Sequence, residues 1–223
     1  MKKLCIFDLD GTVLDTVPTI AHYGNAALVK NGLAPIPEKE YNYLAGRGIV
    51  SLVRGMMRTR GETDEALYES VFRDYDEAYN ADPAHLTSVF RGLRPVLDEM
   101  RERGILLAVV SNKPDFAARS IIEQFYGHDY FFFVTGQREG VALKPDPSAV
   151  LSVFKTAGAS PSDCLYIGDT STDMETGRNA GIFTVGVLWG FRGREELLAS
   201  GANAIVSTPA ELLPLAFDGT ESK

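Results

Sequence analysis

Apolar residues along the chain follow two patterns, short unbroken runs and helical spacings, which alternate from about residue 90 onward. The unbroken runs, which suit buried strands, occupy residues 4–7, 105–110, 130–134, 164–167, 182–187 and 204–206. Helical spacing is found between them, at residues 94–100, 114–125, 147–157 and 172–180. Apolar strands separated by helices predict an α/β fold, a doubly wound parallel sheet covered by helices on both faces.

Residues 15–84 depart from this alternation, because they contain helical patterns only. The predicted helices lie at residues 18–30, 37–45, 49–60 and 63–80. We therefore expect two units, a core made of residues 1–14 and 85–223 and an inserted all-helical domain of residues 15–84. Asp82, Pro83 and the stretch to Phe90 read as the linker that returns the chain to the core.

Composition limits the classes of partner. The 223 residues can bury a full core plus a modest insertion, and the net charge of −8 argues against a nucleic-acid backbone as partner. No apolar run approaches the ~20 residues that span a bilayer. Lys2 and Lys3 resemble the start of a signal peptide, but Asp8 interrupts the apolar run that follows. We expect a cytoplasmic protein with no membrane partner.

The cysteines and histidines carry no predicted chemistry. Cys5 and Cys164 lie among aliphatic residues in predicted strands, which is typical of buried structural thiols. His22, His85 and His128 are scattered, without the spacing of metal ligands. No zinc or disulfide site is expected.

The first apolar run ends at two acidic residues, Asp8 and Asp10, which are followed by a glycine. The chain leaves the strand here, so both carboxylates can turn toward one point at its carboxyl edge. Two such carboxylates repel each other unless a cation compensates the charge or one of them keeps a proton. An exposed acidic turn is the alternative.

Polar residues follow other predicted strands in the same way. Ser111-Asn112-Lys113 comes directly after the run at 105–110, and Asp169 and Asp173 follow the run at 164–167. Lys144-Pro145 lies in a loop after residues 130–134. Ligands of parallel α/β sheets bind outside the carboxyl ends of the strands, where these residues should meet. Helix capping is the alternative explanation for Asp169 and Asp173.

These motifs, in this order, resemble the signature of the phosphoaspartyl-forming phosphatases of the haloacid dehalogenase superfamily. The resemblance extends from residue 4 to about residue 213 and implies a Rossmann-like core. The helical insertion is similar to the small cap of the branch that contains phosphoglycolate phosphatases and β-phosphoglucomutases. The segment 186–191 resembles the C-terminal part of phosphoglycolate phosphatases in particular.

The resemblance assigns roles to the acidic residues. Asp8 is implied to attack phosphorus, and Asp10 to protonate the leaving group and then to activate water. Mg²⁺ would be held by Asp8, by the main-chain carbonyl of Asp10 and by Asp169. Asp173 would hold metal-bound water or orient Lys144. Dehalogenases typically lack the second aspartate, so Asp10 favours a phosphatase.

Further residues are implied to face the phosphoryl group. Ser111, the Asn112 amide and Thr12 would contact its oxygens, and Lys144 would neutralise their charge. We expect the side chain of Lys113 to point away if that of Ser111 points inward.

Substrate selection is expected in the inserted domain. Arg47, between Gly46 and Gly48, lies where related enzymes carry a specificity loop, and it could bind a substrate carboxylate in a bidentate pair. Arg54 and Arg58 read as a solvated helix face.

The favoured interpretation is a Mg²⁺-dependent phosphatase of a small phosphorylated metabolite that forms an aspartyl phosphate, with 2-phosphoglycolate as the leading candidate. The protein would be a monomer or a homodimer. A β-phosphoglucomutase-like phosphosugar mutase and a non-catalytic phosphosugar sensor are the alternatives.

Overall fold

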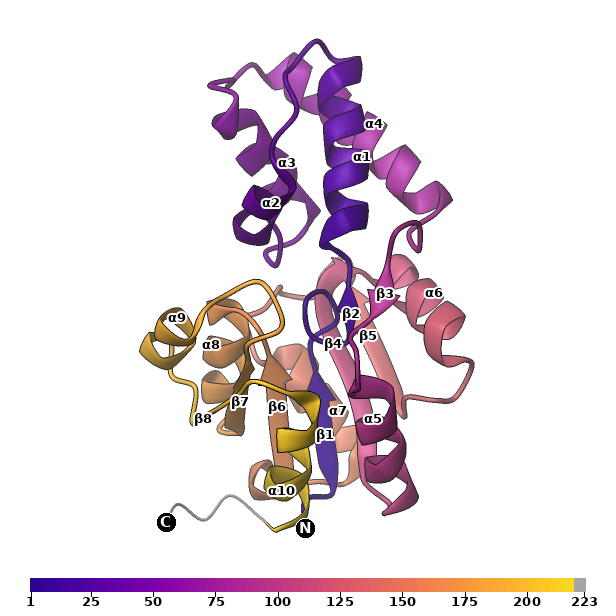
Figure 1. The fold of residues 1–223 in the computed structure, drawn as a ribbon, viewed down its shortest axis with the longest axis vertical. Helices are drawn as coiled ribbons and strands as arrows, with labels where there is room; N and C mark the ends of the chain where they lie inside the picture. The colour runs from indigo at the N-terminus through magenta and orange to yellow at the C-terminus, as the bar shows by residue number, and fades with distance from the viewer. Residues whose placement is uncertain (219–223) are drawn as a thin grey trace.

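The protein, described here by a computed structural model over residues 1–218, contains a parallel six-stranded sheet (Figure 1). Its strands are β1 Leu4–Phe7, β4 Leu106–Pro114, β5 Phe133–Gln137, β6 Cys164–Gly168, β7 Phe183–Val187 and β8 Ala204–Val206. They are ordered β5-β4-β1-β6-β7-β8, and every neighbouring pair is parallel. The predicted doubly wound sheet is confirmed.

Alternate residues of the central strand face two different layers of helices. Cys5 and Phe7 pack in the cluster that includes α5 Leu93–Glu102, α6 Asp115–Tyr126 and α10 Leu212–Phe217. Leu4 and Ile6 face α7 Ser148–Ala157 instead. The remaining core elements are α8 Ser171–Asn179, α9 Arg194–Ala199, η1 Pro161–Asp163 and η2 Pro209–Glu211. Because both faces are covered, the strands are predominantly apolar.

Four helices form a second apolar cluster beyond the carboxyl ends of the strands (Figure 1). They are α1 Val17–Lys30, α2 Glu38–Leu44, α3 Ile49–Thr59 and α4 Glu65–Ala81. Fully or nearly fully buried residues such as Tyr41, Met56 and Val71 give this group a core of its own. The group therefore has an apolar core of its own, separate from the two clusters that cover the sheet.

Two short antiparallel strands join this helical group to the sheet. Strand β2 Leu14–Asp15 pairs with β3 Ser88–Val89, with Leu14 opposite Val89. The sequence predicts a linker near β3 but not this ribbon, since strands of two residues carry no periodicity. The outgoing and returning chains are thus tied together at the junction.

One predicted strand is displaced. The run at 130–134 reads as a strand, but β5 begins at Phe133, while Tyr130 and Phe131 pack edge to face with each other. Both rings also contact Tyr126 of α6. Burial in an aromatic cluster therefore explains the apolar character of the first residues in this run.

Cys5 and Cys164 are free and buried, as expected, and burial raises the pKa of each thiol to about 12. Within residues 1–218, no helix combines the length and the apolar character that a membrane crossing requires.

Candidate active site

Three neighbouring strands bring the polar motifs of distant segments to one edge of the sheet. Asp8 follows β1, Ser111 lies in β4, and Asp169 follows β6, while β4 and β6 flank β1. The Asp8 amide donates to the Ile167 carbonyl at 2.9 Å, which ties the end of β1 to β6. The strand order therefore places the nucleophile candidate between the other two motifs.

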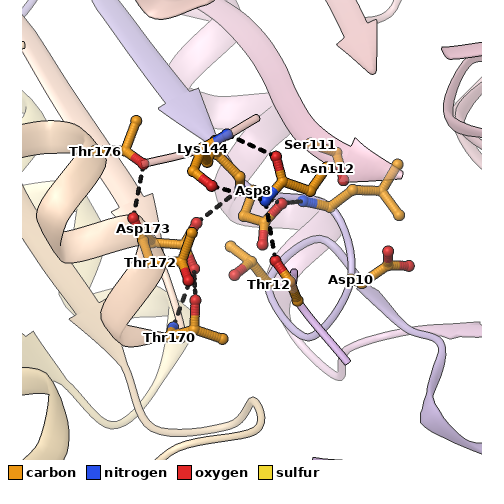
Figure 2. Close-up of polar contacts among 12 residues, drawn as sticks. Asp8, Asp10, Thr12, Ser111, Asn112, Lys144, Thr170, Thr172, Asp173 and Thr176 are labelled. Atoms are coloured by element: carbon orange, nitrogen blue, oxygen red, sulfur yellow. Dashed lines mark hydrogen bonds and ion pairs between the residues drawn. The ribbon is translucent and has the colours of Figure 1, made fainter. Parts of the chain in front are cut away.

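The side chain of Lys144 lies between the carboxylates of Asp8 and Asp173 (Figure 2). Its Nζ lies 2.8 Å from Asp8 Oδ1 and 2.7 Å from Asp173 Oδ1. The Leu9 amide donates to the same Asp8 oxygen at 2.6 Å. Neither contact involves Asp8 Oδ2.

The loop that carries Lys144 is held by the side chain of Asn112. The Lys144 amide donates to Asn112 Oδ1 at 2.8 Å, and Asn112 Nδ2 donates to the Lys144 carbonyl at 3.2 Å. Asn112 Nδ2 also lies 3.2 Å from the Gly46 carbonyl in the loop after α2. Asn112 thus fixes the lysine and links the core to the helical group.

Asp173 has both a capping and an electrostatic role. The Thr170 amide and hydroxyl donate to its Oδ2 at 3.0 and 2.6 Å, which closes the N-terminus of α8. Its Oδ1 accepts from Lys144 and, at 3.4 Å, from Tyr166. Helix capping and contact with the lysine therefore occur together at this residue.

Asp169 is fully buried and oriented by two donors. Thr12 Oγ1 donates to its Oδ1 at 2.8 Å, and the Phe191 amide donates to its Oδ2 at 2.7 Å. Gly11 has a φ of +82°, and a Cβ there would overlap the Asp169 carboxylate. The glycine of the first motif is needed for both reasons. The Thr12 hydroxyl, expected on the substrate, is directed to Asp169.

The acids outnumber the bases that neutralise them. Burial, followed by the charge of Asp173, raises the pKa of Asp8 to about 7 although Lys144 opposes the shift. Burial and the charges of Asp173 and Asp8 also hold the pKa of Asp169 well above its ordinary value. Burial alone would lower the pKa of Lys144, but the charges of Asp173 and Asp8 raise it well above the usual range. The cluster therefore favours an additional cation.

The donor set suits a hard divalent ion. Asp8, Asp169 and Asp173 each offer a carboxylate oxygen, and these oxygens lie within 4.8 Å of one another. Opposite ligands of Mg²⁺ are about 4.2 Å apart, because each lies about 2.1 Å from the ion. Oxygen donors without sulfur or imidazole match Mg²⁺ rather than Zn²⁺. The residues present could hold such an ion.

Asp10 faces away from this cluster (Figure 2). Its Oδ1 accepts from Lys113 Nζ at 2.9 Å. The expectation that Lys113 points away from the site is wrong: its side chain is 5% exposed and lines the same cavity as Ser111. In extended backbone, side chains two residues apart share a side, so Lys113 follows Ser111 in strand β4.

A small cavity of about 50 Å³ lies between the sheet edge and the helical group. Its core side includes Asp8, Asp10, Ser111, Asn112 and Lys113. Its other side is formed by α1, α3, α4 and the loop after α2, through the residues Ile20, Ala45, Gly46, Gly48, Ile49, Leu52, Tyr75, Asp76, Tyr79 and Asn80. This volume holds about four water molecules, so it suits a compact ligand.

Arg47 does not enter this cavity. Its side chain is exposed, whereas the flanking Gly46 and Gly48 contribute to the lining. Arg54 pairs with Glu65 through two contacts of 2.6 Å on the outer surface. Tyr75 and Tyr79 also line the cavity but are not among the predicted site residues; their signal in the sequence is a four-residue spacing of tyrosines on one face of α4.

Comparison with known proteins agrees with this geometry. The family model described as haloacid dehalogenase-like hydrolase matches residues 5–187. The phosphoglycolate phosphatase of Pseudomonas putida is 30% identical over 96% of this chain and 79% of its own length. That of Rhodospirillum rubrum is also 30% identical, over 95% of this chain and 90% of its own. The crystal structure of a candidate phosphoglycolate phosphatase from Lactobacillus delbrueckii subsp. bulgaricus has a TM-score of 0.91 and 29% identity, covering 97% of this chain and 99% of that one.

Proposed function

The chain belongs to the haloacid dehalogenase-like hydrolase family, and on this basis we propose that it is a Mg²⁺-dependent phosphatase of small phosphomonoesters, with 2-phosphoglycolate as the leading substrate. The observation that carries the proposal is the setting of Asp8, whose Oδ1 is held by Lys144 and the Leu9 amide while Oδ2 takes part in neither contact, and whose cavity is also lined by a second carboxylate, Asp10. A binding protein has no need of that second carboxylate.

In this proposal Asp8 Oδ2 attacks phosphorus and the bond from phosphorus to the bridging oxygen breaks, which leaves an aspartyl phosphate. Asp10 gives its proton to the departing alkoxide. Asp10 then takes a proton from the water that attacks phosphorus, and Asp8 is released with inorganic phosphate. An aspartate needs no separate base, because it is ionised at neutral pH when its charge is compensated.

The other residues stabilise charge and hold positions. Lys144 opposes the charge on the transferring oxygens, and Ser111 together with the Asn112 amide donates to them. Asp8, Asp169 and the Asp10 main-chain carbonyl would hold Mg²⁺, and Asp173 would contribute its charge. When bound, the ion supplies positive charge against the Asp8 carboxylate and the phosphoryl oxygens.

We also propose that residues 15–84 act as a cap. The cavity is small, and the helical group forms one side of it, so a movement of that group would widen the cavity for substrate to enter. The β2–β3 ribbon is the junction at which this movement would occur. Closure excludes water from the acyl phosphate until hydrolysis.

The test is release of inorganic phosphate from a panel containing 2-phosphoglycolate, sugar phosphates, nucleotides and pyrophosphate. The proposal expects Mg²⁺-dependent release, fastest from 2-phosphoglycolate, and no turnover by Asp8→Asn. Interconversion of sugar phosphates without phosphate release would instead identify a mutase. An absence of turnover on every compound in the panel would favour the sensor.

A further inference from the structure

Lys113 is the only basic side chain that lines the cavity in the described part of the chain. The cation expected to meet a substrate carboxylate, Arg47, is exposed outside it. Lys144, the other buried lysine of the site, is occupied by Asp8 and Asp173 at the phosphoryl end. Any anionic group on the leaving-group side therefore has one cation within the cavity to bind.

The surroundings of Lys113 on that side are acidic or neutral. Asp10 accepts from its Nζ at 2.9 Å, and Asp76 of α4 lines the same cavity, where it accepts from Asn80 at 3.0 Å. Apart from Asp76, Asn80 and two tyrosines, the side chains that the helical group contributes to the lining are apolar. Without Lys113, a second substrate anion would meet two carboxylates and no positive charge.

The position of Lys113 matches the length of 2-phosphoglycolate. As the acid, Asp10 has to approach the bridging oxygen within about 3 Å. Lys113 Nζ is 2.9 Å from Asp10 Oδ1, which places the ammonium at most about 6 Å from the bridging oxygen if Oδ1 carries the proton, and at most about 8 Å if the other carboxylate oxygen does. The carboxylate of 2-phosphoglycolate is joined to the bridging oxygen through a single methylene carbon, so a carboxylate at this separation is within reach of the Lys113 ammonium.

A second donor stands beside the lysine. Lys113 Nζ lies 4.6 Å from the centre of the Tyr79 ring, which packs on it from α4. Tyr79 is 5% exposed and lines the cavity, and its hydroxyl has no hydrogen-bond partner within residues 1–218. A buried hydroxyl without a partner is costly, so a ligand that accepts from it would restore the lost hydrogen bond.

We propose that Lys113 Nζ and the Tyr79 hydroxyl form a carboxylate subsite, which makes the enzyme select phosphomonoesters that carry a carboxylate next to the ester carbon. The inference rests on the proposed function and names the residues that choose its substrate. An ammonium group has three donors, and Asp10 uses one of them. Tyr79 belongs to the helical group, so the subsite is complete only when that group is closed over the sheet.

The test compares 2-phosphoglycolate with 2-hydroxyethyl phosphate, which has the same length and carries a neutral hydroxyl in place of the carboxylate. The wild-type enzyme should prefer 2-phosphoglycolate in kcat/KM. Lys113→Met should lose about 100-fold in kcat/KM on 2-phosphoglycolate, mainly through KM, and less than about 10-fold on the neutral ester. Lys113→Arg should recover most of the preference.

Other variants separate the parts of the subsite. Tyr79→Phe removes only the hydroxyl and should reduce the preference about 10-fold. Asp76→Asn removes an opposing charge and should increase the preference. Arg58→Met, on the exposed surface of α3, is the matched control for loss of one positive charge and should leave both substrates unaffected.

Several outcomes would overturn the inference. An equal loss on both esters in Lys113→Met would mean that the lysine acts only by positioning Asp10. A loss of preference in Arg47→Met and not in Lys113→Met would assign the carboxylate to Arg47. If Lys113→Met has no activity at all, the affinities of the two esters are measured by calorimetry in Asp8→Asn and in Asp8→Asn combined with Lys113→Met. The inference expects Lys113→Met to weaken binding of 2-phosphoglycolate more than binding of the neutral ester. Failure of the proposed function is distinct, because the wild-type enzyme would then release phosphate from neither ester.

Discussion

Replacing Asp8, the proposed nucleophile, by Asn should stabilise the metal-free protein while abolishing its activity. Asp8 is 4% exposed, and burial together with the charge of Asp173 raises its pKa from an ordinary 3.8 to about 7. The folded protein therefore binds a proton at Asp8 more tightly than the unfolded chain does. Each pH unit is worth about 1.36 kcal/mol, so ionised Asp8 costs the folded state roughly 4 kcal/mol at pH 8.

The sign follows from the direction of the shift. Because the pKa of Asp8 is higher in the folded state than in the unfolded chain, the free energy of unfolding of the protein falls as the pH rises from about 4 to about 7. Asp8→Asn has no charge to bury at any pH. In EDTA at pH 8, the variant should exceed the wild type by roughly 4 kcal/mol in free energy of unfolding, or roughly 10 °C in Tm. At pH 5 the difference should fall below about 2 kcal/mol.

The assay is urea and thermal unfolding followed by circular dichroism, at both pH values and with or without Mg²⁺. Asp115→Asn is the control of opposite sign. Although burial raises the pKa of Asp115, the Gly136 amide and Arg119 lower it overall, so its replacement should destabilise the protein. If the metal-free Asp8→Asn variant is no more stable than the wild type at pH 8, then burial and the charge of Asp173 do not destabilise ionised Asp8, and the reasoning is refuted.

Three further predictions concern the residues that support the site. Thr12→Val removes the 2.8 Å hydrogen bond to Asp169 and should weaken Mg²⁺ affinity about 10- to 100-fold, measured by Mg²⁺ titration of activity; unchanged affinity would contradict this role. Asn112→Ala leaves the buried Lys144 amide without its acceptor and should cost about 1–3 kcal/mol in unfolding free energy and lower kcat; equal stability and kcat would exclude Asn112 as the residue that holds the lysine. EDTA should remove phosphatase activity and Mg²⁺ should restore it, so turnover in EDTA would reject the metal assignment.

The sequence predicts best where a periodic pattern is long. The predicted helix at 18–30 is found as Val17–Lys30, and that at 49–60 as Ile49–Thr59, because each combines helical spacing with a boundary at Pro, Gly or Asn. The strand at 204–206 is found as Ala204–Val206. The sequence does not predict the two-residue ribbon, whose stability comes from tertiary pairing rather than from its own residues.

The site is predicted only in part, because some of its residues follow from the strand pattern and others depend on tertiary packing. Asp8, Ser111 and Asp169 fall at strand ends, so the order of a parallel sheet is enough to bring them together. The position of Lys113 depends on β4 continuing in extended form to Pro114, beyond the apolar run that marks it in the sequence. The contact of Tyr79 with Lys113 depends on how the helical group lies over the sheet, which no local pattern records.

The most direct test of the central claim is a single turnover with ³²P-labelled 2-phosphoglycolate in Mg²⁺, quenched in acid and followed by peptide mapping. The account predicts a hydroxylamine-sensitive phosphoryl group on Asp8, present in the wild type and absent from Asp8→Asn. Label on any other residue, or turnover by Asp8→Asn at a rate near that of the wild type, would contradict it.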